Sequence, residues 1–132
     1  MAIDIQESLR IVTILLPGVT SEEDVVALAQ GIKGHLLRAT APIAFVIDLT
    51  DNDGGTAKQR REVGEFFSGK GARFGLCAGI AAVAKSDGQH AFLRGILAMG
   101  PMPCPYRLFE SVGEAGTWAR TRIRAAEKPV AD

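Results

Sequence analysis

The sequence predicts an α/β domain with a mostly parallel sheet, because short apolar runs alternate with helix-start signals along the chain. The chain has 132 residues, enough to bury one hydrophobic core. Four apolar runs are rich in β-branched or aromatic residues, which is typical of strands. Each run is followed by a Ser or Thr with a Glu or Gln three residues later, which is the pattern of a helix capping box.

The apolar runs give the strands in chain order: 9–16, 43–49, 76–84 and Tyr106–Phe109. The second and third runs are continuously apolar, as expected for central strands that are covered on both faces. The first residues alternate weakly, with Ile3 and Ile5 apolar, and predict an antiparallel edge hairpin with the first run around Ser8.

The capping pairs give the helix starts, because such a pair satisfies backbone groups that the first turn leaves free. Apolar residues at helical spacing follow each pair. The resulting order is β-β-α-β-α-β-α-β-α, and right-handed crossovers then give a mostly parallel, mixed sheet of about five strands with helices on both faces. We expect one domain over 1–132 with a frayed tail over 127–132. The four pairs are Thr20 with Glu23, Thr56 with Gln59, Ser86 with Gln89, and Ser111 with Glu114.

Charge and composition exclude several classes of function. Fifteen Lys plus Arg balance fifteen Asp plus Glu, so no net charge attracts nucleic acid or an acidic membrane surface. Cys77 and Cys104 lack the spacing of a metal or disulfide motif, which predicts free thiols in a reducing compartment. The start of the chain has no signal-peptide pattern, and the longest apolar run is too short to cross a bilayer. We therefore expect a cytoplasmic protein without a transmembrane segment.

The segment between the second apolar run and its helix is the main candidate for a binding site. It leaves the carboxyl end of a predicted central strand and enters a helix N-terminus, where ligands and anions collect in open α/β sheets. The simpler interpretation is a glycine turn with a solvated acidic loop and a helix cap. The candidate residues for partner binding or phosphorylation are Asp48, Asp51, Asn52, Asp53, Gly54, Gly55 and Thr56.

Complete catalytic or cofactor motifs do not emerge from the spacing. The carboxylates of the acidic loop lack the calcium-loop pattern that ends in a bidentate Glu. The segment 69–71, Gly-Lys-Gly, lacks the Ser or Thr of a phosphate-binding loop and follows a helix. His35 and His90 lie on different predicted helices, and no nucleophile-elbow pattern accompanies them. We therefore predict no metal, no cofactor and no enzymatic activity.

A loop of three prolines and two methionines, 99–105, separates the third helix from the last strand. As a plain connection it needs no ligand. Alternatively, its apolar side chains form one wall of a groove for a lipid-like molecule or a partner. Residues that we assign to such a lipophilic groove are Phe66, Phe67, Met99, Met102 and Trp118.

The element order resembles that of the STAS-like superfamily, which includes anti-sigma-factor antagonists and distant SEC14-like relatives. The segments that carry the resemblance are 15–20 (LLPGVT), 45–49 (FVIDL) and 109–118 (FESVGEAGTW). In the antagonists, a Ser or Thr at the start of the helix after the central strand is phosphorylated by a partner kinase, and Thr56 has that place by order. This chain has Asp53-Gly54-Gly55-Thr56 where the family has Asp-Ser-Ser-Gly. The SEC14-like branch implies a lipophilic ligand.

Two hypotheses follow. The first is a non-enzymatic regulatory module that binds a protein partner through the segment 48–56 and the following helix. The second is a carrier or sensor of a lipophilic small molecule. An uncharacterised enzyme is the further alternative, ranked third. The edge strands are also compatible with a homodimer.

Overall fold

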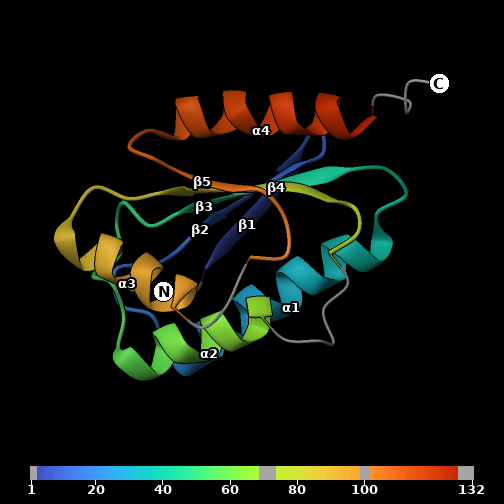
Figure 1. Cartoon of the computed structure of the whole chain (residues 1–132). Coiled ribbons are helices and arrows are strands. Elements are labelled where there is room, and N and C mark those ends of the chain that lie inside the picture. Colours follow the sequence, from blue (N-terminus) through green and yellow to red (C-terminus); the bar gives the residue numbers. More distant parts are fainter. Residues whose placement is uncertain (1–2, 69–73, 99–101, 128–132) are drawn as a thin grey trace.

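Five strands form one sheet whose spatial order, β1-β2-β3-β4-β5, is the order along the chain (Figure 1). The computed structural model describes residues 3–68, 74–98 and 102–127. The elements are β1 Asp4–Ser8, β2 Ile11–Leu15, α1 Glu22–Arg38, β3 Ile43–Asp48, α2 Ala57–Ser68, β4 Cys77–Val83, α3 Asp87–Leu97, β5 Tyr106–Phe109 and α4 Val112–Glu127. The predicted order of strands and helices is confirmed.

The helices cover the two faces of the sheet unequally. The parallel strands β2 to β5 advance in one direction across the sheet, so right-handed crossovers place α1, α2 and α3 on the same face. After β5, α4 turns back over the opposite face of the sheet (Figure 1). The prediction of helices on both faces is confirmed. The strand order determines that three helices lie on one face and α4 lies on the other.

The hairpin predicted at the start of the chain is present. Strand β1 pairs antiparallel with β2, with Ile5 opposite Ile14. The turn lies at Leu9 and Arg10, which have positive φ values of 52° and 67°. Two positive φ values are typical of the tight hairpin turns that suit strand twist. For this reason β2 begins two residues later than the apolar run that predicted it.

Two of the predicted capping boxes are reciprocal. Gln59 N donates to Thr56 Oγ1 at 3.1 Å, and Gln59 Oε1 accepts from Thr56 N at 2.9 Å. The pair Ser86 and Gln89 forms the same two bonds at the start of α3. At α4, Ser111 Oγ accepts from the backbone of Glu114 at 3.1 Å.

The first capping pair was wrong by one residue. Helix α1 begins after Ser21, which forms a reciprocal box with Asp24. The hydroxyl of Thr20 is used elsewhere, because Thr20 Oγ1 accepts a hydrogen bond from Asn52 Nδ2 at 2.7 Å. Burial raises the pKa of Asp24, but several smaller effects, led by hydrogen bonds from Ser21 and including a backbone hydrogen bond from Ile3, together hold that pKa below its usual 3.8.

The hydrophobic core has a different character on each face of the sheet. Large side chains such as Phe45, Ile14 and Ile47 fill the face under α1, α2 and α3. On the other face, small residues of β3 and β4 meet Ala115 and Ala119 of α4, so that helix lies close to the strands. Of the predicted apolar stripe on α4, these two and Ile123 are buried, whereas Val112 is exposed.

The structure describes the predicted tail and two predicted connections only in part. Glu127, placed in the tail from sequence, is the last residue of α4 and forms an ion pair with Arg10. The rest of that tail, 128–132, and the segment 69–71 with Met99 lie outside the described residues. Within the described ranges, no helix has the length and apolar character needed to cross a membrane.

Candidate functional site

The segment 49–56 leaves the carboxyl end of β3, the central strand, and crosses the edge of the sheet between two neighbouring loops. On one side it meets the loop after β2, where Asp53 N donates to Gly18 O at 3.0 Å. On the other side, Leu49 N donates to Val83 O at the end of β4 at 2.9 Å. The segment is therefore fixed to both neighbouring connections.

Asn52 holds this segment from beneath. Its side chain is 4% exposed, and its Nδ2 donates to Pro17 O at 2.5 Å and to Thr20 Oγ1 at 2.7 Å. Its Oδ1 accepts from Gly54 N at 2.8 Å. Burying an amide costs little free energy when both its nitrogen and its oxygen are hydrogen-bonded, and these bonds fix the geometry around it. Asn52 is thus a structural anchor of the segment rather than an accessible binding group.

Two buried glutamines complete the anchoring. Gln59 Nε2 donates to Thr20 O at 2.6 Å, and this bond joins the start of α2 to the loop before α1. Gln89 Nε2 donates to Thr50 O at 3.0 Å and to Asn52 O at 2.9 Å. Each glutamine also caps its own helix through Oε1. The capping residues of α2 and α3 therefore also position the candidate site.

Both glycines of the segment have a backbone conformation that side chains disfavour, and Gly54 also makes a close contact with α3. Gly54 has φ +100° and is buried, and a Cβ on it would lie 2.4 Å from Gly88 O at the start of α3. Gly55, with φ +63°, also requires the left-handed region, which side chains disfavour. The Arg60 guanidinium donates to Gly54 O at 3.1 Å and to Gly55 O at 3.3 Å. The close contact with Gly88 allows α3 to approach the segment.

Of the seven candidate residues, three present exposed side chains at the sheet edge: Asp51, Asp53 and Thr56. Asp48 instead turns into the segment, where Oδ1 accepts from Thr50 N at 2.9 Å and from Thr50 Oγ1 at 2.7 Å. The Asp53 carboxylate accepts from Gly55 N at 2.8 Å. Beside these groups, Val19 is 75% exposed in the loop after β2. We call Val19, Asp51, Asp53 and Thr56 the edge surface.

The neighbourhood of the edge surface is mainly acidic. Glu22 and Glu23 lie in the first turn of α1, and Asp87 lies in the first turn of α3. Acidic side chains at these helix starts also complement the positive ends of the helix dipoles. Lys58 pairs with Glu22 at 3.0 Å and draws the starts of α1 and α2 together. In the part of the chain that the structure describes, no three His, Cys, Asp or Glu residues form a group suited to a metal ion.

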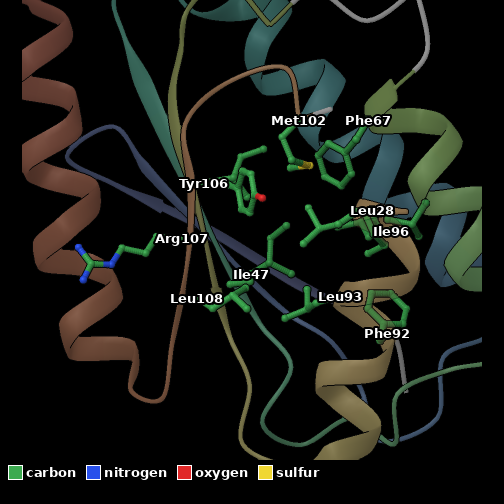
Figure 2. Close-up of a pocket in the computed structure, with 14 residues that line it drawn as sticks. Leu28, Ile47, Phe67, Phe92, Leu93, Ile96, Met102, Tyr106, Arg107 and Leu108 are labelled. Atoms are coloured by element: carbon green, nitrogen blue, oxygen red, sulfur yellow. The ribbon is translucent and has the colours of Figure 1, made fainter. Parts of the chain in front are cut away.

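The proposed lipophilic residues do not lie together. Phe67 and Met102 line a pocket between α3, α2 and β5 (Figure 2), whereas Trp118 lies on the opposite face of the sheet against Phe109. Phe66 is packed edge-on against Phe67 and Phe74. Met99 is outside the described residues. The single groove predicted from sequence is therefore wrong, because α4 and the third helix cover different faces.

The pocket is apolar and small. Its cavity measures about 40 Å³, and side chains of α3 and the sheet, including Phe92, Leu93 and Ile96, form its walls (Figure 2). Tyr106 and Leu108 of β5 reach it from the edge of the sheet and are 46% and 41% exposed. Arg107 points away, toward α4, with its guanidinium carbon 5.5 Å from the centre of the Phe109 ring.

Sequence reasoning missed Tyr106 and Leu108 as candidates, although their spacing contained a signal. Alternate residues of a strand point to the same face, so both belong to the face of α3 while Arg107 belongs to the other. The two histidines remain apart. His35 Nδ1 lies 3.0 Å from Glu7 Oε1 at the hairpin, whereas His90 lies in α3.

Comparison with known proteins relates this architecture to two solved structures. One is an uncharacterised DUF3478-family protein with a SpoIIAA-like fold from Shewanella loihica PV-4, 20% identical, with a TM-score of 0.61 over 89% of this chain and 92% of that chain. The other is an anti-sigma factor antagonist from Mycobacterium paratuberculosis, 17% identical, with a TM-score of 0.57 over 90% and 93%. No protein-family model matches, and no curated protein shows significant sequence similarity. The likeness shows a SpoIIAA-like, STAS-type fold, as predicted.

Proposed function

We propose that this protein is a regulatory module that binds a protein partner through the edge surface and the adjoining start of α2. The observation that carries the proposal is the anchoring of this surface. Asn52, Gln59 and Gln89 are buried beneath it and fully used in holding the segment 49–56 to its neighbours. A surface that is held rigid before contact loses less conformational entropy when a partner binds.

The composition of the edge surface indicates the kind of partner. Two exposed carboxylates, Asp51 and Asp53, stand beside the exposed apolar side chain of Val19. A complementary partner presents Lys or Arg side chains around an apolar contact. The Thr56 hydroxyl caps α2 by accepting a bond from Gln59 N, and the residue is exposed at the same edge. The antagonist with the similar fold is consistent with such a module.

Phosphorylation of Thr56 is the finer form of this proposal. A phosphate adds about −1.5 to −2 charges, and its position at the start of α2 is favoured by the helix dipole. The same charge would stand close to the carboxylates of the edge surface and would change the potential that a basic partner meets. Phosphorylation would therefore alter the affinity for that partner.

The test is photo-crosslinking in the source cells, with a crosslinking amino acid at position 56 or, as control, at Thr121 on the exposed side of α4. We expect the crosslinker at position 56 to capture a protein, and we expect Asp53→Lys to abolish this adduct. The crosslinker at position 121 should not capture the same protein. Equal adducts from both positions, or an adduct at 56 indifferent to Asp53→Lys, would contradict the proposal. The affinity of the captured partner for the Thr56→Glu variant is then compared with its affinity for the Thr56→Ser and Thr121→Glu variants. This comparison tests whether negative charge at position 56 alters binding.

A second candidate function is the binding of a small apolar ligand in the pocket between α3 and β5. The favouring observation is the combination of apolar walls with exposed Tyr106 and Leu108 at the mouth. The cavity of about 40 Å³ is well below the roughly 150 Å³ that accommodates benzene in an engineered cavity. A lipid would require this pocket to widen, which is why partner binding is ranked first.

Native mass spectrometry of freshly purified protein tests the second candidate. A small-molecule adduct that is lost on denaturation and absent from Leu93→Phe, which fills the pocket, would support ligand binding. An unliganded mass in the wild-type protein would count against it. This measurement is independent of the crosslinking result, because the pocket and the edge surface share no residue.

A further inference from the structure

The two cysteines of the chain, expected from sequence to be free thiols, lie in contact. Cys77 Sγ and Cys104 Sγ are 3.0 Å apart, although 27 positions separate them along the chain. Cys77 is the first residue of β4 and is 6% exposed, while Cys104 lies in the loop before β5 and is partly buried. The contact joins β4 to the loop before β5, at the amino end of the sheet.

Backbone contacts on both sides hold the two thiols in place. Cys77 N donates to Phe74 O at 2.9 Å, and Cys77 pairs with Ile43 in the register of β3 and β4. Cys104 lies between two prolines, which restrict the backbone there. The next residue, Pro105, accepts a hydrogen bond from Ile80 N at 2.9 Å. The contact between the sulfurs is therefore a consequence of strand pairing and not of one adaptable side chain.

We propose that Cys77 and Cys104 form a thiol–disulfide modification site that reacts with small-molecule disulfides. From the 3.0 Å of the reduced pair, the sulfurs must approach to about 2.0 Å for a covalent bond. This site lies at the amino end of β4, whereas the edge surface lies at the carboxyl end of the sheet. The inference therefore does not depend on the proposed function.

The environment of each thiol assigns the order of the two steps. The contact with Cys104, followed by burial, raises the pKa of the Cys77 thiol, which stays protonated and shielded. Cys104 is the more accessible of the two and attacks first. Its thiolate forms a mixed disulfide with one half of the reagent and expels the other half as a thiolate, which takes up a proton.

Cys77 completes the reaction. Once Cys104 carries the mixed disulfide, it is no longer the thiol whose contact raised the pKa of Cys77. Cys77 then loses its proton to solvent and attacks Cys104 Sγ as a thiolate. The second half of the reagent leaves as a thiolate, which takes up a proton. In total, two protein thiols are oxidised to one disulfide, and one reagent disulfide is reduced to two thiols. Met102 and Tyr106, two residues before and after Cys104, line the apolar pocket. The disulfide would thus fasten one wall of that pocket to β4.

Incubation of the purified, reduced chain with oxidised glutathione tests the site by intact mass and peptide mapping. We expect the wild-type protein to lose the mass of two hydrogen atoms, to retain no glutathione, and to link the Cys77 and Cys104 peptides. The melting temperature should rise by about 10 °C, because a cross-link of this loop length constrains the unfolded chain. A stable glutathione adduct on wild-type protein, or dimers joined through Cys104, would overturn the proposal.

Single-cysteine variants separate the two steps. Cys77→Ala should stop at a glutathione adduct on Cys104, whereas Cys104→Ser should remain unmodified because Cys77 is buried. Circular dichroism of each variant establishes that it is folded. If Cys77→Ala does not fold, the wild-type protein is used instead. It is incubated with a limiting amount of oxidised glutathione, and the reaction is quenched rapidly with acid. The transient adduct should then map to Cys104, and an adduct on Cys77 would contradict the order.

Discussion

The carboxyl edge of the sheet and the pocket beside β5 use opposite means to shape a surface. At the edge, buried amides of Asn52, Gln59 and Gln89 fix the backbone through hydrogen bonds, and the short side chains of the edge surface, three polar and one apolar, reach solvent. At the pocket, apolar side chains provide the shape, and two of them, Tyr106 and Leu108, remain about half exposed.

The difference has a physical reason. Hydrogen bonds depend steeply on distance and angle, so a buried polar network permits one arrangement of its backbone. Apolar contacts depend mainly on area and tolerate shifts of neighbouring groups. We therefore expect the edge to be intolerant of substitution at its buried residues, and the mouth of the pocket to be tolerant. The three predictions below test this contrast, in order of decreasing effect.

The largest effect is expected from Gly54→Ala. The added Cβ would lie 2.4 Å from Gly88 O, and φ +100° disfavours any side chain, so we expect a loss of about 4 kcal/mol in the free energy of unfolding. Urea denaturation followed by circular dichroism measures it. The matched control is Gly116→Ala in α4, where a Cβ meets nothing within 4 Å. That change should stabilise by about 0.5–1 kcal/mol. A loss below about 1 kcal/mol at position 54 would show that the edge is adaptable.

The second effect is expected from Asn52→Ala. Truncation leaves Pro17 O, Thr20 Oγ1 and Gly54 N without their partner in a buried site, so we expect a loss of about 3 kcal/mol. The control is Gln6→Ala, which removes an exposed hydrogen bond from Gln6 Nε2 to Asp4 Oδ2 and should cost less than about 0.5 kcal/mol. Similar midpoints for the two variants in urea would show that burial of the network contributes nothing.

The smallest effect is expected from Leu108→Ser at the mouth of the pocket. Because Leu108 is 41% exposed, we expect a loss of about 0.5–1 kcal/mol. Leu93→Ser lines the same pocket from a buried position and should cost about 3 kcal/mol or more. Thermal unfolding of the two variants compares them directly. If Leu108→Ser were as destabilising as Leu93→Ser, the mouth would belong to the rigid core and the contrast would fail.

Sequence patterns determined the features whose causes are local. Strands β2 to β5 each show an apolar run, and the boxes at Thr56 and Ser86 need only a partner three residues away. The place of the segment 48–56 at the carboxyl edge followed as well, because alternating strands and helices with right-handed crossovers admit few arrangements. These features do not require knowledge of distant contacts.

Tertiary structure decided whatever depends on residues that are distant in sequence. Asn52 engages Thr20 across 32 positions, so the next residue, Ser21, caps helix α1, which begins at Glu22. The strand order places Trp118 and Phe67 on opposite faces and divides the predicted groove. Pairing of β4 with β5 brings Cys77 to Cys104. Periodicity reports which face of an element is apolar, but only the packed sheet determines which elements share that face.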